Sequence, residues 1–217
     1  MLRTCALALC GALWPLIASA AQPVCAIKDA AAAGHRAWLL CEEYKVLASN
    51  GDATNWDTQS LPSTEEELTT IRFLDSNRGF VVGERGTLFA TSDGGREWRP
   101  VTLPTNEDLS AIHSVGESVW IAGWGGIILH SGDGGQTWQE QTSGVSQGLE
   151  GIYFADAQHG WAVGWVGTIL RTTDGGEHLE QGRGFCAVCD EYGGFLIAIS
   201  AVFHVSCGSR VILRGRG

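Results

Sequence analysis

The sequence has few basic residues and no long apolar run outside its N-terminus. No stretch of 18 or more apolar residues follows the first 20 positions, so nothing internal is expected to span a membrane. Only 14 lysines and arginines stand against 24 acidic residues, and no basic patch interrupts the acidic field over 21–182. Such a field repels phosphate backbones, which argues against nucleic-acid binding. Glycine, by contrast, is abundant, and 30 glycines in 217 residues predict many tight turns.

The first 20 residues have the composition of an export signal. They contain one early arginine, a short apolar run and small residues at positions 18–20. Pro15 and the absence of acidic residues fit poorly with the alternative, a buried first helix. Cleavage after Ala20 or Ala21 would release the chain outside the cytoplasm. The expected location is the periplasm, the thylakoid lumen or the extracellular space.

Removal of this signal would leave an odd number of cysteines: Cys25, Cys41, Cys186, Cys189 and Cys207. In an oxidising compartment at least one of these thiols stays free or pairs with another chain, and the spacing does not fix the pairing. The Cys-x-x-Cys spacing at 186–189 is that of a redox or zinc half-site. However, only Cys207 could join it, because His204 lies in an apolar run. We therefore expect no metal and no other cofactor.

One segment recurs along the chain with a nearly constant period. Residues 79–95, 119–135 and 160–176 align without a gap, and each segment ends in Asp-Gly-Gly. A decayed copy precedes them at 36–56, where Trp56 falls on the position of Trp98 in the next copy, 42 residues later. A period of this length is typical of a repeat architecture, and it outweighs any interpretation of a single motif.

Each copy divides into four short strand signals separated by glycine and aspartate turns. In the second copy the signals lie at 69–74, 79–83, 87–92 and 96–102. Four strands per unit describe the blade of a β-propeller, in which neighbouring blades stack to bury both faces of each sheet. The glycine density and the missing 3.6-residue pattern exclude a helical solenoid. The predicted fold is all-β, an incomplete β-propeller of about four four-stranded antiparallel blades, at 24–61, 66–104, 107–142 and 147–182.

The recurring Asp-Gly-Gly is interpreted as a structural turn. Its carboxylate can accept hydrogen bonds from amides of the same turn, its glycine takes a positive φ, and a tryptophan covers the turn from the next strand. Calcium binding is disfavoured, because each turn offers one carboxylate and a calcium site needs six to eight oxygens. The pattern resembles the Asp box, or BNR repeat, of sialidases and other propellers. Its positions are Thr91, Asp93, Gly95 and Trp98; Ser131, Asp133, Gly135 and Trp138; Thr172, Asp174, Gly176 and Leu179; and, in decayed form, Ser49, Gly51, Ala53 and Trp56.

The fuller signature joins the Asp box to a preceding Gly-[Phe/Trp]-x-Val-Gly-x-x-Gly-Thr segment, as at 79–95 and 160–176. It resembles the signature of the photosystem II stability and assembly factor-like family of exported β-propellers, over roughly residues 24–182. The resemblance implies a non-catalytic, protein-binding scaffold that assists the assembly or stability of photosystem II or another membrane complex. It also implies a protein or peptide partner, such as a subunit of that complex.

Two features depart from that family. Its closed rings usually have more blades, and in this chain the periodicity stops after Gln181. The stretch 183–217 is interpreted either as a diverged closing blade or as a frame-shifted end, which would make the chain a truncated, non-functional fragment of a larger propeller. Four blades would also leave unpaired strand edges, and since such edges pair with other chains, self-association is expected.

A sialidase-like glycoside hydrolase is the alternative function. Such enzymes share Asp boxes but need a cluster of arginines, a Tyr–Glu nucleophile pair and an acid/base carboxylate. The equivalent first-strand positions here hold Arg72, His113 and Tyr153, and none of the three tyrosines is tied by spacing to a carboxylate. We therefore expect no enzymatic activity.

The binding surface is predicted on the face opposite the Asp boxes. In a four-stranded meander the turn between the second and third strands emerges on that face, and here it carries Glu84, Arg85, Trp124 and Trp165. Tryptophans at turn tips are costly to expose without purpose, and they are frequent anchors for protein partners. The alternative is that each ring folds back over its own blade. Arg72, His113 and Tyr153 are expected to line or approach the central channel, although the sequence does not separate inward from blade-facing positions.

Overall fold

The computed structural model describes residues 25–49, 51 and 55–182, together with the backbone of three strands at 195–199, 202–207 and 210–211. The expected signal at 1–20, Ala53 and the Cys-x-x-Cys segment lie outside the described residues. Strands make up nearly all of the regular structure, which confirms the all-β fold. Among the described residues, no helix has the length and apolar character needed to cross a membrane.

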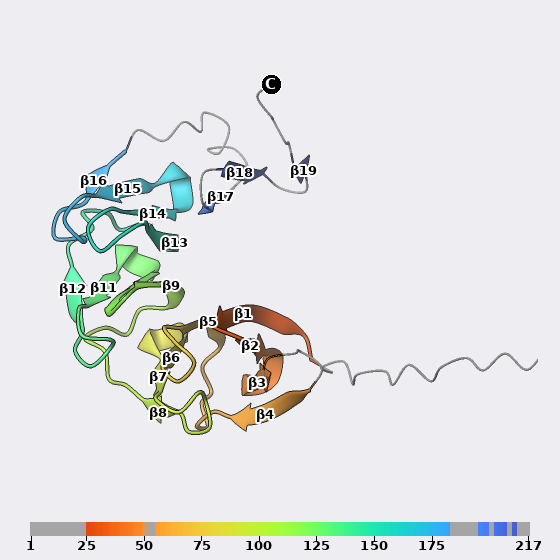
Figure 1. Ribbon diagram of the computed structural model, residues 1–217. Coiled ribbons are helices and arrows are strands. Elements are labelled where there is room, and N and C mark those ends of the chain that lie inside the picture. Colours follow the sequence, from red (N-terminus) through yellow and green to blue (C-terminus); the bar gives the residue numbers. More distant parts are fainter. Residues whose placement is uncertain are drawn as a thin grey trace, which may run out of the picture.

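Four sheets of four antiparallel strands follow one another along the chain, and within each sheet the strands pair in sequence order. This is the blade arrangement expected from the repeat, and we call the sheets blades 1 to 4. Figure 1 shows them set around an arc, with β5, β9 and β13 toward the hollow and β8, β12 and β16 on the outside. The strands are β1 Ile27–Ala33, β2 Arg36–Cys41, β3 Lys45–Ser49, β4 Trp56–Ser60; β5 Leu68–Phe73, β6 Gly79–Gly83, β7 Leu88–Thr91, β8 Arg99–Pro100; β9 Leu109–Val115, β10 Ser118–Gly123, β11 Ile128–Ser131, β12 Gln139–Gln141; β13 Leu149–Phe154, β14 Gly160–Gly164, β15 Ile169–Thr172 and β16 Glu180–Gln181.

The fourth strand of blade 2 is shorter than the sequence indicated. A strand was expected over 96–102, but β8 contains only Arg99–Pro100. Residues 92–98 form the Asp-box turn instead. Trp98, which has high β-propensity, is buried as part of this turn, and the turn's own hydrogen bonds replace the ladder bonds of a longer strand.

A single turn of 3-10 helix joins the second and third strands of every blade. These turns are η1 Glu42–Tyr44, η2 Glu84–Gly86, η3 Trp124–Gly126 and η4 Trp165–Gly167. In blade 2 a Cβ at Gly83 would collide with the carbonyl oxygen of Glu67, and one at Gly86 would collide with that of Thr105. The Gly-x-x-Gly spacing therefore lets the turn lie directly on the chain segments that enter its own blade and the next.

The apolar core lies between the blades. Side chains of the second strand alternate between the two faces of a blade, as expected for a strand buried on both sides. Val81 belongs to the cluster between blades 1 and 2, whereas Phe80 and Val82 belong to the cluster between blades 2 and 3. A third cluster around Leu149 and Leu170 fills the interface between blades 3 and 4. Each blade is thus stabilised by the apolar contacts that it makes with neighbouring blades.

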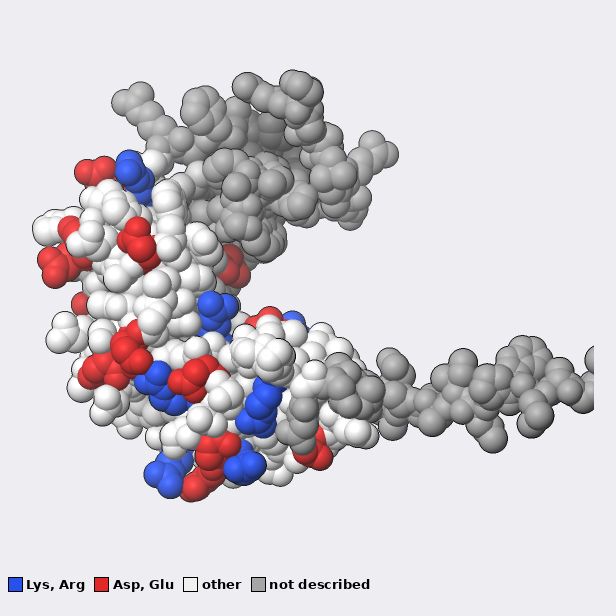
Figure 2. Space-filling view, in the orientation of Figure 1, with Lys and Arg blue, Asp and Glu red and all other residues white. Residues whose placement is uncertain are grey.

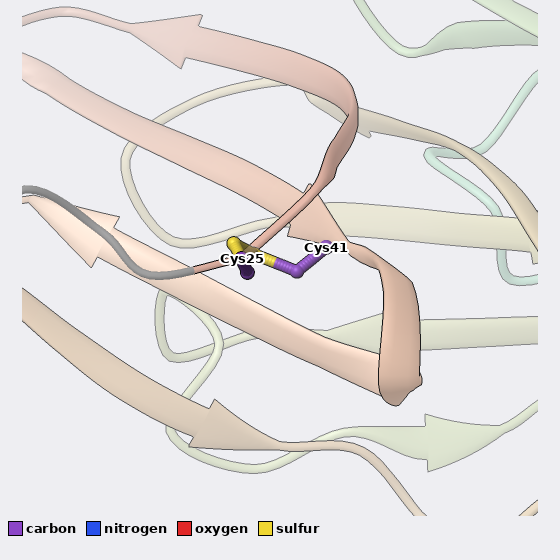
Figure 3. Close-up of a disulfide and its surroundings, with 2 residues drawn as sticks. All are labelled: Cys25 and Cys41. Atoms are coloured by element: carbon purple, nitrogen blue, oxygen red, sulfur yellow. A yellow bond between two sulfur atoms is a disulfide. The ribbon is translucent and has the colours of Figure 1, made fainter.

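One disulfide joins Cys25, just before β1, to Cys41 at the end of β2 (Figure 3). The two Cα atoms are 5.8 Å apart, a usual separation for a disulfide. This pairing could not be chosen from the sequence, which offered five cysteines. Of Cys207 only the backbone is described.

The chain after blade 4 contributes the backbone of a three-stranded antiparallel sheet. Its strands are β17 Phe195–Ile199, β18 Val202–Cys207 and β19 Arg210–Val211. The first of them, β17, contacts β13 and β14 of blade 4. The interpretation of 183–217 as a diverged blade or a frame-shifted end stays a prediction, and so do the exact limits of the four repeat units.

Candidate functional site

The three Asp-box turns share one hydrogen-bond pattern. In the first, the Thr91 hydroxyl donates to Asp93 Oδ1 at 2.9 Å, and the same oxygen accepts from the amide of Glu97 at 3.0 Å. The amide of Gly95 donates to the Thr91 hydroxyl oxygen at 2.9 Å. Equivalent bonds recur around Asp133 and Asp174. The carboxylate of each box is therefore engaged within its own turn.

These hydrogen bonds favour the ionised carboxylate. The pKa of Asp93 is lowered chiefly by the amide of Glu97. The pKa of Asp133 is lowered chiefly by the hydroxyl of Thr137, and that of Asp174 chiefly by the amide of His178.

The second glycine of each box is needed for two reasons. Gly95, Gly135 and Gly176 have φ values of +91°, +90° and +100°, a left-handed conformation that favours glycine. A Cβ at any of them would also collide with a side chain of the preceding blade, which is Gln59, Phe80 and Gln141 in turn. The second glycine of each box is thus a contact point at which a side chain of the preceding blade packs.

The ligand atoms of Asp174, Glu177 and His178 lie within 4.8 Å of one another, close enough to consider a metal. Here His178 Nδ1 is 2.7 Å from Asp174 Oδ2. In the preceding box Thr137 donates to the same oxygen of Asp133 at 2.6 Å. His178 therefore takes part in the hydrogen bonding of the turn itself, and the group carries no argument for a metal.

The Asp boxes and the 3-10 turns lie at opposite ends of the blades. In blade 2, η2 precedes β7 and the box follows it, so the two flank the same strand. We call the end that carries the 3-10 turns the turn face. It holds the four turn residues expected at the binding surface, together with Val166.

Trp124 and Trp165 lie side by side on the turn face. Their ring centroids are 5.7 Å apart and their planes are inclined by 50°. The two residues are 47% and 38% exposed. Gly148 lies beneath both rings, since a Cβ there would be 3.2 Å from Trp165 Cδ1 and 3.5 Å from Trp124 Cδ2. The rings contact each other across the boundary between blades 3 and 4, and each keeps a large exposed area.

Glu150 is a neighbour of this pair that sequence reasoning missed. The register of β13 on β14 skips Glu150, which makes it a β-bulge at the start of the strand. Its carboxylate accepts a hydrogen bond from Trp165 Nε1 at 2.5 Å. The equivalent residue of blade 2, Thr69, donates to the backbone carbonyls of Val82 and Leu109 instead. The only signal in the sequence was an acidic residue within the third repeated first-strand segment.

Glu84 and Arg85 occupy the turn face of blade 2, and both are held by neighbouring groups. The guanidinium of Arg85 lies 3.2 Å from the Glu66 carboxylate, and its amide donates to Asp108 at 2.9 Å. The Glu84 carboxylate accepts from the amide of Glu67 at 3.4 Å. The charge of Arg85 is thus paired within the protein.

Arg72, His113 and Tyr153 lie on the innermost strands β5, β9 and β13, and side chains of neighbouring inner strands contact one another. Arg72 Nε donates to Ser114 Oγ at 3.2 Å, and the rings of His113 and Tyr153 are 4.8 Å apart. The amide of Phe154 donates to His113 Nδ1 at 3.3 Å. Burial, and secondly the charge of Arg72, lowers the pKa of His113 to about 4. Both Arg72 and His113 therefore contact the next inner strand.

Comparison with known proteins identifies a family that the repeats resemble. Residues 48–151 match the family model described as "Photosynthesis system II assembly factor YCF48". The photosystem II assembly lipoprotein Ycf48 of Trichormus variabilis is 41% identical over 61 residues, which are 28% of this chain and 18% of that protein. The photosystem II stability/assembly factor HCF136 of Arabidopsis thaliana is 36% identical over 79 residues, 32% of this chain and 20% of that protein. The chain thus spans about a fifth of the length of these relatives, and the family resemblance of its repeats is confirmed.

A solved structure described as YCF48 bound to D1 peptide superposes on 70% of this chain and 56% of that one, with a TM-score of 0.52 and 22% identity. An ancestral GH74 enzyme superposes on 87% of this chain and 31% of that one, with a TM-score of 0.64 and 13% identity. At such identities the similarity establishes the propeller fold and not the activity, because one fold hosts many functions.

Proposed function

Because its repeats match those of the photosystem II assembly factors related to Ycf48, we propose that this chain is a non-catalytic, exported scaffold. It binds a protein or peptide segment of a membrane complex through the turn face, and the complex is photosystem II or another assembly of that kind. The relative solved with a bound D1 peptide supports a peptide ligand for this fold.

The observation that carries the proposal is the exposed Trp124–Trp165 pair. Two indole rings that touch across a blade boundary and remain 47% and 38% exposed present a continuous apolar surface to solvent. Patches of this kind mark interaction sites, and tryptophan is among the residues that most often anchor an interface.

A non-catalytic role is supported by the innermost strands. A sialidase-like site needs several arginines for the substrate and a tyrosine beside a carboxylate. In the described part of the chain, Arg72 is bound to Ser114, and the ring of Tyr153 packs against His113. Turnover of fluorogenic sialosides or xyloglucan-derived substrates by the purified chain would favour the glycosidase alternative, while no turnover across the panel would favour the scaffold.

Export is supported by the disulfide between Cys25 and Cys41. Disulfides persist in oxidising compartments such as the periplasm or the extracellular space and are rare in the cytosol. Fractionation of expressing cells, followed by blotting and a thiol-alkylation shift, tests both the location and the oxidised state of this pair.

The test of the proposed function is a pull-down from detergent-solubilised membranes of the source organism, with bound proteins identified by mass spectrometry. Trp124→Ala together with Trp165→Ala should abolish recovery of the partner while the far-UV spectrum and melting temperature stay unchanged. Trp161→Ala is the matched control, because Trp161 is 36% exposed but lies on β14 away from the 3-10 turns. Unchanged recovery accompanied by a loss of stability would assign both rings to the core.

Self-association through open blade edges belongs to the same proposal. The blades at the two ends of the described arc lack a neighbouring four-stranded blade on one side each (Figure 1). Sedimentation velocity over a hundredfold concentration range would detect association, and a concentration-independent monomer would argue against it.

A further inference from the structure

Blades 3 and 4 have an unusual charge balance. Between residues 105 and 182 the only lysine or arginine is Arg171, against ten acidic residues. In Figure 2 blue and red side chains mix over blades 1 and 2, whereas the part over blades 3 and 4 is mostly white and red. Charged side chains repel their own sign over about a Debye length, so this half of the molecule favours a cationic ligand.

Three acidic groups around blades 1 to 3 have cationic partners. Glu67 pairs with Lys28, Glu66 pairs with Arg85, and Glu117, on the box side of blade 3, pairs with Arg78 of blade 2. On the turn face of blades 3 and 4, Glu107 and Glu150 have no ion pair with any described residue.

In blade 2, the position equivalent to Glu107 is paired with an arginine of the same protein. Glu66 precedes β5 as Glu107 precedes β9, and Arg85 holds the middle position of η2 as Gly125 holds that of η3. In blade 2 the guanidinium lies 3.2 Å from its carboxylate. In blade 3 the carboxylate is in place, since a Cβ at Gly125 would lie 3.2 Å from Glu107 Cδ, but the guanidinium is absent.

The Trp pair adjoins this position. Trp124 precedes Gly125 directly, and its ring contacts that of Trp165. A cation within about 6 Å of an indole centroid is attracted by the negative face of the ring. The Glu150 carboxylate, bound to Trp165 Nε1, adds negative charge beside the same surface.

We propose that Glu107, Glu150 and the Trp124–Trp165 pair form a site for an arginine or lysine side chain of the partner, so that the segment bound by the turn face is basic. The cation takes the place beside Glu107 that Arg85 takes beside Glu66, and its apolar stem covers the indoles. This inference rests on the proposed function for the surface, and it adds the chemistry of the segment that the surface selects.

The direct test uses the full chain and four capped peptides of alternating glycine with arginine, lysine, citrulline or glutamate. Binding is followed by tryptophan fluorescence and by calorimetry, at low salt and at 0.5 M salt. The arginine and lysine peptides should bind, the neutral citrulline isostere should bind at least about tenfold more weakly, and added salt should weaken the binding. Equal affinity for citrulline and arginine peptides, or preference for glutamate, would overturn the inference.

The decisive variant is Gly125→Arg, which copies blade 2 into blade 3. Gly125 has φ of +69° and Arg85 has φ of +52°, so the fold already accommodates an arginine in this conformation. The new guanidinium should pair with Glu107 and reduce arginine-peptide affinity about tenfold or more, at the cost of a modest loss of thermal stability from the left-handed φ. The matched control is Gly116→Arg, at φ of +60° in the β9–β10 turn on the opposite end of the same blade, with no atom within 4 Å of its Cβ. It adds the same charge and should leave binding unchanged, and Glu107→Gln should weaken binding several-fold without adding bulk.

The outcomes separate this inference from the proposed function. If the double tryptophan variant loses the membrane partner but arginine and citrulline peptides bind alike, the surface is a partner site of another chemistry and the cation site is refuted. If Gly125→Arg and the double tryptophan variant both leave recovery of the partner unchanged, the proposed function itself fails. Equal losses from Gly125→Arg and Gly116→Arg would reduce the effect to net charge and refute the local site.

Discussion

The two interfaces of blade 2 with its neighbouring blades are held by different contacts, one partly by hydrogen bonds and the other by apolar packing. Between blades 1 and 2, Trp38 Nε1 and Gln59 Nε2 both donate to the carbonyl oxygen of Gly94, each at 3.0 Å. The interface between blades 3 and 4 repeats this arrangement, with Trp120 and Gln141 donating to the Gly175 carbonyl at 2.8 and 3.1 Å. The interface between blades 2 and 3 has Phe80 and Val101 at the two donor positions, and these side chains join an apolar cluster.

The difference extends to the first strand of the receiving blade. Trp38 stacks on Phe73 with centroids 3.6 Å apart, and Trp120 stacks on Phe154 at 3.7 Å. The equivalent residue of blade 3 is Ser114, which offers no ring, and Phe80 meets Trp138 edge to face at 6.1 Å instead. The common element is therefore the paired glycines of the Asp box, which leave room for any of these side chains. The hydrogen bonds to the box carbonyl are an addition used at two interfaces out of three.

Removing the indole at a polar interface should have the largest effect. Trp120 is fully buried, so Trp120→Ala should lower the free energy of unfolding by about 3–5 kcal/mol through the cavity and the lost hydrogen bond. Phe80→Ala is the matched change at the apolar interface and should fall at the lower end of that range. Urea unfolding followed by circular dichroism measures both. A smaller loss for Trp120→Ala than for Phe80→Ala would mean that the polar arrangement adds no stability.

Replacing the amide alone should have a moderate effect. Gln141→Val puts the side chain class of Val101 at the polar interface and leaves the Gly175 carbonyl with one donor, Trp120 Nε1. The expected loss is about 0.5–1.5 kcal/mol, the usual net value of one hydrogen bond. Gln59→Val tests the same change at the first interface. If neither variant loses stability, valine packing fully replaces the amide.

The blades and their Asp boxes could be predicted because their causes are local. Short strands, paired glycines and the Thr-x-Asp turn lie within 20 residues of one another, so their spacing carries the structure directly. The identity of the contacts between blades could not be predicted in this way. Trp38 and Trp120 find their acceptors 56 and 55 residues further along the chain, and only the assembled arc brings them together.

The contacts within the candidate site were likewise not predictable from the local sequence. The position of Trp124 and Trp165 on the 3-10 turns followed from the repeat, but their mutual contact depends on the space left by Gly148, and the bond to Glu150 depends on a bulge. The shortness of β8 was missed because Trp98 and Val101 have high β-propensity, whereas Trp98 belongs to the Asp-box turn and Val101 lies beyond the short strand. Equivalent positions of consecutive repeats were a usable signal that neighbouring turns would meet.

Acid should weaken the polar interface between blades 3 and 4 more than the apolar one. His113 accepts a hydrogen bond from Phe154 across it, and its pKa falls from the ordinary value of 6.5 to about 4. Its folded form therefore binds fewer protons than the unfolded form between these values. The stability that it contributes is complete above pH 6.5 and is lost as the pH falls toward 4. The loss should be smaller than that of Trp120→Ala, because His113 is only half-buried and is screened by solvent.

His113→Asn checks this assignment, because the asparagine oxygen can accept from the Phe154 amide but does not titrate in this range. Stability measured by urea unfolding at pH 7, 6, 5 and 4 should fall less steeply for the variant than for the parent. Parallel curves for the two proteins would place the acid sensitivity elsewhere.

The smallest change in stability is expected at Trp161, in the last of the four described blades. Trp161 holds in blade 4 the position that Trp120 holds in blade 3, but it is 36% exposed while Trp120 is fully buried. No Asp box follows blade 4 among the described residues, so the indole has no box carbonyl to bind there. Trp161→Ala should then change the free energy of unfolding by less than about 0.5 kcal/mol, as for an exposed surface residue. Urea unfolding at two protein concentrations measures this change. A loss near that of Trp120→Ala that grows with concentration would show that a second copy covers the ring in solution, and the interface would then be continued between molecules instead of ending at blade 4.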